Sequence, residues 1–429
     1  MKEDFLHYVW KYRKFGFDSL YTTDGSSVDI ISVGSHNTSR SGPDFFNSCL
    51  LIEDQKWAGT VEIHIKSSDW YVHGHEKDIN YDNVILHVVW EDDVEVLRKN
   101  NSKVPTLALK EFVAPAVLNT YNKLVLSNKS SSWLSCEKQL VDVPAFTAAN
   151  WKEKLYIERL LFKNDTIVSL CKTTKNDWEA VFYTLVAKGF GLNANGEAFM
   201  SMVQSIPYKL IRKYKNSIQQ LEALLFGQQG LLDQEIEDPY YQSLQEEYKF
   251  IKHKHDLSNV GVLSAEFFRL RPSNFPTIRL SQYAAFVSSD DHFFESILNF
   301  DRIEQFYNIF NVATSNYWET HYTFGKESKF RKKRITNPFV DLLLINVVVP
   351  FLFAYNRSQG SEDHSKLFAL IQQLRPEQNA VIEIFKKAGM QVNSAMDSQA
   401  CLQLKTLYCV KNKCLQCAFG NYFLNHHSI

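Results

Sequence analysis

The sequence lacks a long uninterrupted apolar run. The longest, Leu342–Tyr355, has 14 residues and contains Asn346 and Pro350, whereas a membrane-spanning helix needs about 20 apolar residues. The first 17 residues carry charges throughout and lack the apolar segment of a secretory signal. The sequence therefore predicts a protein that neither spans a membrane nor carries a secretory signal.

The sequence also has few cysteines and almost no net charge. Seven cysteines, an odd number with four of them after residue 400, do not form the dense framework of a secreted disulfide-rich domain. We therefore predict a cytoplasmic protein. With 47 basic and 48 acidic residues the formal net charge is −1, so no global positive field indicates a nucleic-acid partner. Any such partner has to be bound by local patches.

The composition is that of a globular protein, with 45% hydrophobic and 22% charged residues. A chain of 429 residues is long enough for two or three domains. Beyond residue 150 the apolar spacing is helical. We predict an α+β or α/β fold, with an N-terminal mixed sheet and flanking helices followed by a mainly helical region. Alternating apolar residues after an N-terminal helix predict strands at 28–33, 47–53, 60–66, 84–90 and 94–97.

The domain boundaries follow from the same patterns. A sheet domain is predicted over residues 1–126, a mainly helical region with up to two subdomains over 136–395, and a cysteine-containing tail over 396–429. The serine-rich run 127–135 is the predicted linker. The helices expected after residue 150 include 178–190, 199–205, 217–230 and 366–390.

The most informative stretch is the third predicted strand. Apolar residues alternate there with Glu62, His64 and Lys66, so an acid, an imidazole and an amine share one face. Asp44 follows a Gly-Pro turn upstream, and Glu3 lies on the first helix. Carboxylates bind Mg²⁺ or Mn²⁺, and a lysine near the metal can stabilise the charge that develops in phosphodiester hydrolysis. The pattern is typical of a metal-dependent hydrolytic site.

This order of residues resembles the core of PD-(D/E)xK nucleases, in which an acid after a turn meets an acid-x-lysine strand. The resemblance implies a restriction-endonuclease-like fold and a metal-dependent nuclease that acts on DNA or RNA. Asp44 and Glu62 would bind Mg²⁺ or Mn²⁺, and Glu3 would be an optional outer ligand. His64 would be a ligand or the base, and Lys66 would stabilise the transition state. The sequence departs from the pattern at His64, which stands where these nucleases have an acid.

Longer stretches are similar to the bacterial domain of unknown function 2851 family. This resemblance spans nearly the whole chain and implies no particular activity. The stretches that carry it are GPDF (42–45), WAGTVEIHIKSSDWYVHGHEKD (57–78), YDNVILHVVWE (81–91), EALLFGQQG (222–230), RPSNFPTIR (271–279) and CLQCAFG (414–420).

A second set of metal ligands follows the strand. His73 and His75 are two residues apart, so an extended segment would point both side chains the same way. Together with His64 and Asp78 they form a candidate site for zinc or manganese. A zinc or manganese metallohydrolase is therefore one alternative function, and a non-catalytic nucleic-acid-binding or scaffold protein is another. His87, inside an apolar strand, is predicted to be a core histidine.

Four cysteines gather in the C-terminal tail. Cys401, Cys409, Cys414 and Cys417 lie within 17 residues. The two-residue spacing of the last pair is typical of a clamp for zinc or for an iron–sulfur cluster. We predict that these four residues bind Zn²⁺ or such a cluster, and buried reduced cysteines are the alternative. Some nucleases of the resembled superfamily carry a C-terminal cysteine cluster, which fits this prediction.

Basic residues gather in two places. Lys326–Arg334 has six basic residues in nine, and two arginines flank a proline-bearing loop at 272–276. Basic side chains neutralise phosphates, so these segments predict a nucleic-acid partner, although a solvated face is the alternative for each patch alone. The residues predicted to contact it are Arg271, Arg279, Lys329, Arg331, Lys332, Lys333 and Arg334.

Overall fold

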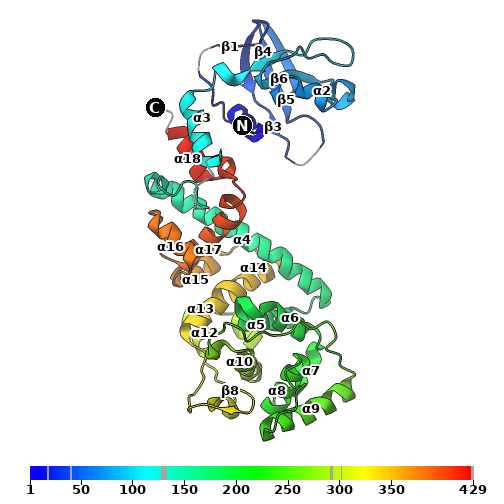
Figure 1. Cartoon of the computed structure of the whole chain (residues 1–429), viewed down its shortest axis with the longest axis vertical. Coiled ribbons are helices and arrows are strands. Elements are labelled where there is room, and N and C mark those ends of the chain that lie inside the picture. The colour runs from blue at the N-terminus through cyan, green and yellow to red at the C-terminus, as the bar shows by residue number, and fades with distance from the viewer. Residues whose placement is uncertain (17–18, 39–40, 127–132, 290–292, 301, 427–429) are drawn as a thin grey trace. The chain divides into compact units, whose positions relative to one another are not determined.

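A computed structural model of the chain (Figure 1) describes residues 1–16, 19–38, 41–126, 133–289, 293–300 and 302–426. The chain forms two compact units. Unit 1 consists of Met1–Lys152, Glu383–Gln391 and Cys401–Ile429, and unit 2 consists of Glu153–Ile382 and Val392–Ala400. Unit 1 thus contains both the N-terminal sheet and the cysteine tail. Residues 127–132 of the predicted linker lie outside the described residues.

Unit 1 is built on a mixed β-sheet with the strand order β1-β2-β4-β5-β6-β7, in which β3 pairs with β4 outside this path. Pairing is antiparallel from β1 to β5 and parallel from β5 to β7. The strands are β1 (Leu20–Tyr21), β2 (Ser27–Ser32), β3 (Ser35–His36), β4 (Phe45–Ile52), β5 (Gln55–Lys66), β6 (Val84–Glu91) and β7 (Thr106–Ala108).

The mixed sheet and the α+β class are confirmed, but one predicted strand is wrong. Residues 94–97 form no strand, and Leu97 makes only an isolated bridge to Lys103. The parallel edge is instead β7, whose three residues are too few to show an alternating pattern.

The sheet of unit 1 is covered by short helices. Helix α1 (Glu3–Lys11) buries its apolar side chains and packs against β5. After β5 the chain forms α2 (Asp69–Val72), η1 (His75–Lys77) and η2 (Ile79–Tyr81) before it returns as β6. The remaining helical segments of this unit are η3 (Leu109–Glu111), α3 (Pro115–Tyr121), η4 (Asn122–Leu126), η5 (Leu140–Asp142), η9 (Lys405–Cys409), η10 (Cys414–Gln416) and α18 (Ala418–His426).

Unit 2 is mainly helical, as predicted, with one small hairpin of β8 (His321–Thr323) and β9 (Lys326–Glu327). Its helices are α5 (Trp178–Phe190), α6 (Leu192–Gln204), α7 (Tyr208–Tyr214), α8 (Ile218–Gln228), α9 (Pro239–His255), η6 (Pro272–Asn274), α10 (Pro276–Ser288), α11 (Phe293–Leu298), α12 (Ile303–Ile309), η7 (Asn316–Glu319), α13 (Asn337–Leu343), η8 (Leu344–Val348), α14 (Val349–Ser358) and α15 (Ser365–Gln373). Helices α4 (Ala145–Thr173), α16 (Ala380–Lys387) and α17 (Ala395–Leu404) contribute residues to both units.

Two prolines affect the helices differently. The helix predicted at 366–390 is interrupted between α15 and α16, where Pro376 removes a backbone donor. Pro350, in contrast, is tolerated at the start of α14, after the π-helical turn η8.

The resulting continuous helix Asn337–Ser358 is longer than the apolar run seen in the sequence. By length and composition it is apolar enough to cross a membrane, but 72% of its most apolar window is buried inside the protein. The core helix of a soluble protein has the same properties.

Candidate metal centre

Strand β5 places two polar side chains in the interior of unit 1. Glu62 and His64 alternate with apolar Val61 and Ile63, so the two polar residues point to one face of the sheet. Only 5% of Glu62 and 1% of His64 is exposed. Burying an acid and an imidazole costs free energy unless both find partners, which makes their neighbours informative.

Asp44, just before β4, lies directly beside Glu62. Its backbone N–H donates to Oε2 of Glu62 at 3.1 Å, and the N–H of Ile63 donates to Oδ2 of Asp44 at 2.9 Å. The register of β4 on β5 makes this possible, because Phe45 pairs with Val61. The structure therefore brings together the two acids that the sequence singled out.

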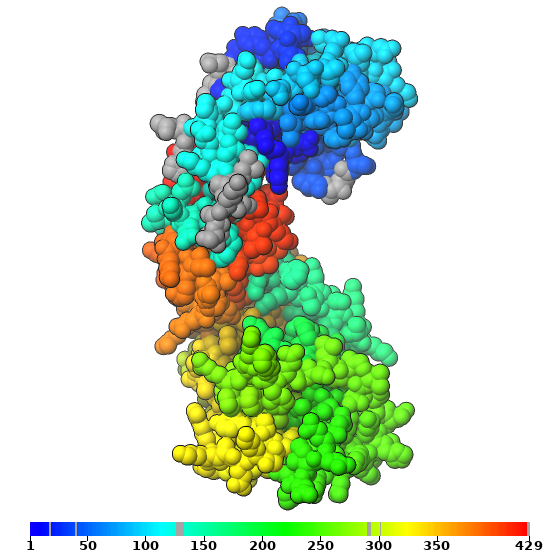
Figure 2. All heavy atoms as spheres, in the orientation of Figure 1, coloured from blue at the N-terminus to red at the C-terminus, as the bar shows by residue number. Residues whose placement is uncertain are grey.

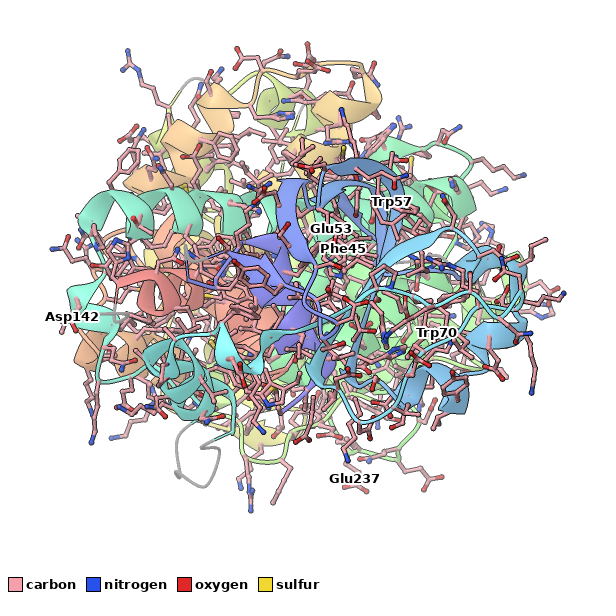
Figure 3. All side chains as sticks on the ribbon, turned by 90° about the horizontal axis from the view of Figure 1, so that it is seen from above. Phe45, Glu53, Trp57, Trp70, Asp142 and Glu237 are labelled. Carbon is pink, nitrogen blue, oxygen red and sulfur yellow. The ribbon has the colours of Figure 1, made fainter. Side chains whose placement is uncertain are left out.

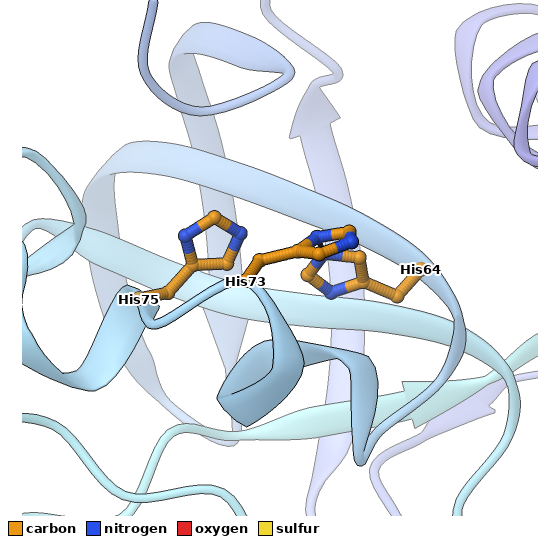
Figure 4. Close-up of side chains that lie close together, drawn as sticks. All are labelled: His64, His73 and His75. Carbon is orange, nitrogen blue, oxygen red and sulfur yellow. Dashed lines mark hydrogen bonds between the residues drawn. The ribbon is translucent and has the colours of Figure 1, made fainter.

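Three histidines converge next to Glu62. His64 from β5 and His73 and His75 from the segment after α2 each offer a ring nitrogen, and these atoms all lie within 4.8 Å of one another (Figure 4). Nε2 of His64 lies 3.0 Å from Nδ1 of His73. Oε1 of Glu62 lies 3.5 Å from Nε2 of His64 and 3.3 Å from Nε2 of His75. Three imidazole nitrogens thus lie close together, and a carboxylate oxygen of Glu62 lies beside two of these histidines.

Aromatic packing fixes the ring of His75. Tyr81 stacks on it with ring centroids 3.7 Å apart, and Trp70, labelled in Figure 3, contacts it edge-on at 5.3 Å. The contact of His75 with Glu62 does not have hydrogen-bond geometry, and Nε2 of His75 is a buried atom without a hydrogen-bond partner. A buried nitrogen lone pair that is held in place beside a carboxylate fits a metal ligand.

His87 on β6 contacts the second ring nitrogen of His64. Its Nε2 lies 2.8 Å from Nδ1 of His64, and the residue is fully buried. When His64 carries its proton on Nδ1 and donates it to His87, Nε2 of His64 is free to bind a cation. The burial predicted for His87 is therefore observed, together with a direct contact to the histidine group.

Burial keeps the imidazoles of His64 and His87 neutral. It lowers the pKa of His64 to about 2 and that of His87 to about 3, and in each case nearby histidines add to the effect. Burial also raises the pKa of Glu62 well above its usual range, and the charge of Asp44 adds to this. Neutral imidazoles bind metal without first losing a proton. A divalent cation would also offset the repulsion between the two acids.

Helix α1 adds a residue that the sequence reasoning missed. Nε2 of His7 lies 3.2 Å from Oδ2 of Asp44. Burial lowers the pKa of His7, but the nearby Asp44 carboxylate, with the charge of Glu3, outweighs burial and raises it. Burial and the charge of Asp44 raise the pKa of Glu3. The four-residue spacing of Glu3 and His7 on one helix face is the signal that identifies His7 in the sequence.

Two predicted site residues lie apart from the histidine group. Lys66, the last residue of β5, is half exposed, and its Nζ lies 3.9 Å from Oδ2 of Asp93 rather than beside Asp44 or Glu62. Oδ1 of Asp78 accepts the backbone N–H of Asn80 and caps η2. Strand alternation alone did not reveal this, because β5 ends at Lys66, where the buried part of the strand has already finished.

Two of the predicted nucleic-acid contacts are buried in the structure. Arg279 is 8% exposed, donates to Asn274 and Gln282, and lies over the ring of Phe339. Lys333 is 7% exposed and donates to backbone carbonyls. Both donate hydrogen bonds inside the protein. The exposed members of the predicted set are Arg271, Lys329, Arg331, Lys332 and Arg334.

The predicted cysteine site is also rearranged. One cavity of unit 1 is lined by Cys136 and by three cysteines of the tail, Cys409, Cys414 and Cys417. Cys401 does not line it, and its thiol contacts the sulfur of Met390 at 3.4 Å. Cys136 escaped sequence reasoning because it precedes the tail by more than 250 residues.

The fold and the site define an α+β protein whose N-terminal sheet carries a buried histidine–carboxylate cluster. Residues 3–380 match the family described as protein of unknown function (DUF2851). The chain belongs to this family. Neither the curated proteins nor the solved structures contain a match to this chain.

Proposed function

We propose that this protein is a metal-dependent hydrolase that binds a divalent ion through His64, His73 and His75, with Glu62 completing the site. The convergence of three imidazole nitrogens within 4.8 Å, beside a carboxylate, carries this proposal. Imidazole suits zinc and manganese better than magnesium, which prefers oxygen ligands. The observation therefore favours the histidine-based site over a carboxylate-only magnesium site.

The residues around the ion would divide the chemistry among them. A bound divalent cation supplies an activated water and polarises the scissile group. Asp44 holds His7 at the edge of the site, where 19% of the His7 side chain is exposed. The raised pKa of His7 suits a general acid that protonates the leaving group. In this scheme Lys66 has no direct role, since it pairs with Asp93.

A basic groove beside the site supports an anionic substrate. His7 and His36 line it together with Lys2, Lys11, Lys411 and Lys413, and Asp4 is the one acid among its lining residues. Figure 2 shows the N-terminal residues (dark blue) next to C-terminal residues (red), in agreement with the contact of α1 with η10.

Four lysines near one metal site would neutralise successive phosphates. Tyr12, which is 46% exposed, also lines the groove and offers a ring for base stacking. We therefore propose a phosphodiester substrate, DNA or RNA, and a nuclease activity.

We place this activity in the cytoplasm. All seven cysteines lie among the described residues and none of them forms a disulfide, the state that a reducing compartment maintains.

The test combines metal analysis with a cleavage screen. The purified full chain is incubated with zinc, manganese or magnesium and with single- and double-stranded DNA and RNA. His73→Ala removes an exposed ligand, so the fold should persist while metal affinity and cleavage fall about 100-fold. His253→Ala, an exposed histidine of unit 2, is the matched control and should change neither.

The outcomes separate the alternatives. Metal that is bound but supports no cleavage of any substrate favours the non-catalytic scaffold. Metal content that is the same in wild type and His73→Ala rules out the histidine site.

A further inference from the structure

Four of the seven cysteines line a single cavity in unit 1. This cysteine cavity is formed by Cys136, Cys409, Cys414 and Cys417, with apolar neighbours such as Leu124 and Leu134. The other three cysteines lie elsewhere, in β4, in α4 and at Cys401. Three of the lining cysteines lie within nine residues of the tail, at the end of η9, at the start of η10 and directly after η10, whereas Cys136 comes from the stretch before η5. The fold therefore adds Cys136 to a group that is local in the sequence.

Burial raises the pKa of the Cys417 thiol, and the backbone N–H groups of Gly420 and Phe419 oppose this effect. Backbone donors near a sulfur stabilise its thiolate form. Close packing holds this arrangement, because a Cβ added at Gly420 would lie 2.0 Å from the carbonyl oxygen of Cys414.

We propose that the cysteine cavity is a four-thiolate site that binds a metal centre, either an iron–sulfur cluster or a zinc ion. Binding replaces the four thiol protons, which are released to solvent. Among the described residues, only the histidine group brings three or more ligand atoms to a single point. The four sulfurs surround a cavity instead. This favours a polynuclear iron–sulfur cluster, since zinc needs all its sulfurs about 2.3 Å from one point.

The metal centre would link parts of the chain that lie far apart in the sequence. Unit 1 is discontinuous, because the chain leaves it at Lys152 and returns through Glu383–Gln391 and from Cys401 onward. A metal centre that joins Cys136 to Cys409 closes a loop containing all of unit 2. Closing so long a loop removes entropy from the unfolded chain. The metal centre would hold the tail, including Lys411 and Lys413 of the basic groove, against the N-terminal domain.

The test is metal analysis of the full chain purified without oxygen, then reconstituted with zinc or with iron and sulfide. Iron with acid-labile sulfide and a visible charge-transfer band identifies a cluster, and zinc alone identifies a single ion. Cys409→Ser should lose this metal. Cys401→Ser, in the same tail but outside the cavity lining, is the matched control and should keep it.

A second measurement guards against a variant that only misfolds. Reconstitution of the metal-free wild type should give a thiolate-to-metal absorption band, with iron and sulfide if the site holds a cluster and with cobalt if it holds a single ion. Cys401→Ser should retain this band and Cys136→Ser should lack it. His73→Ala should leave the band unchanged, so this proposal and the hydrolase proposal fail separately. The proposal is overturned if reconstituted wild type holds no more metal than Cys409→Ser, or if Cys401→Ser costs as much metal as Cys409→Ser.

Discussion

Glu62 in unit 1 and Glu222 in unit 2 are both buried glutamates, with 5% and 0% of their surface exposed, but their neighbours differ. Glu222 accepts hydrogen bonds from the hydroxyls of Ser281, Ser315 and Tyr240. Glu62 accepts one backbone N–H and otherwise faces imidazole nitrogens and a second acid. Burial raises the pKa of both glutamates.

The difference separates a structural network from a candidate site. Hydroxyl donors satisfy both oxygens of Glu222, so that cluster is complete without any ligand. Ring nitrogens of His64 and His75 face the carboxylate of Glu62, and Nε2 of His75 has no hydrogen-bond partner. A cation bound between these groups would satisfy them.

Replacing each glutamate by glutamine should affect function differently. Glu62→Gln replaces the carboxylate beside the histidines with a weaker ligand, so metal-dependent cleavage should fall by about 100-fold or more. Glu222→Gln should leave cleavage within about two-fold of wild type, because Glu222 belongs to a satisfied network. Steady-state rates at saturating metal measure both variants. Equal losses in the two variants would remove the contrast.

For stability, removing the side chain of Glu222 should have a larger effect than removing that of Glu62. Glu222→Ala leaves the hydroxyls of Ser281, Ser315 and Tyr240 without their acceptor and opens a cavity, so the free energy of unfolding should fall by about 3 kcal/mol. Glu62→Ala removes an acid that accepts one backbone hydrogen bond and should cost less, about 1 kcal/mol. Chemical denaturation of the metal-free chain measures both. A larger loss for Glu62→Ala would make Glu62 the structural acid.

The sequence predicted the strand that carries the site but not all of the site residues. Regular alternation identified β5 and placed Glu62 and His64 on one face, since that inference needs only local geometry. The approach of Asp44 depended on the register of β4 on β5, which a turn signal between two strands makes predictable.

The missed residues all depend on long-range packing. His7 joins the site through the docking of α1 on β5, and Cys136 joins the cysteine cavity through the return of the chain from unit 2. Arg279 and Lys333 look like a basic surface in the sequence, because one sequence does not reveal that Phe339 or a carbonyl lies against a cation. Charge counts identify basic residues but not their burial.

The pH dependence of stability should identify Glu222 as a buried neutral acid. Burial raises the pKa of Glu222 above 4.5, although its hydroxyl partners oppose this. Over the interval between the unfolded and folded pKa values, the native state keeps a proton that the unfolded chain has lost. The free energy of unfolding contributed by this group therefore falls as the pH rises through that interval.

Glu222→Gln lacks this titration. Its stability relative to wild type should accordingly increase from about pH 4 to about pH 8. Denaturant midpoints of both proteins across that range measure the effect. A difference that stays flat or shrinks with rising pH would mean that Glu222 is ionised in the folded protein.

The smallest expected effect compares basic residues of the two units. The double variant Lys411→Ala and Lys413→Ala removes two cations from the groove beside His7. It should weaken nucleic-acid binding several-fold and lower the slope of log affinity against log salt by about 2. The matched control is Lys329→Ala with Lys332→Ala, two exposed lysines of unit 2, which should change the slope less. Fluorescence anisotropy with a labelled oligonucleotide over a salt series measures both. If the control pair changes the slope more, the phosphate contacts belong to the basic segment of unit 2, and the groove loses its role in the proposed function.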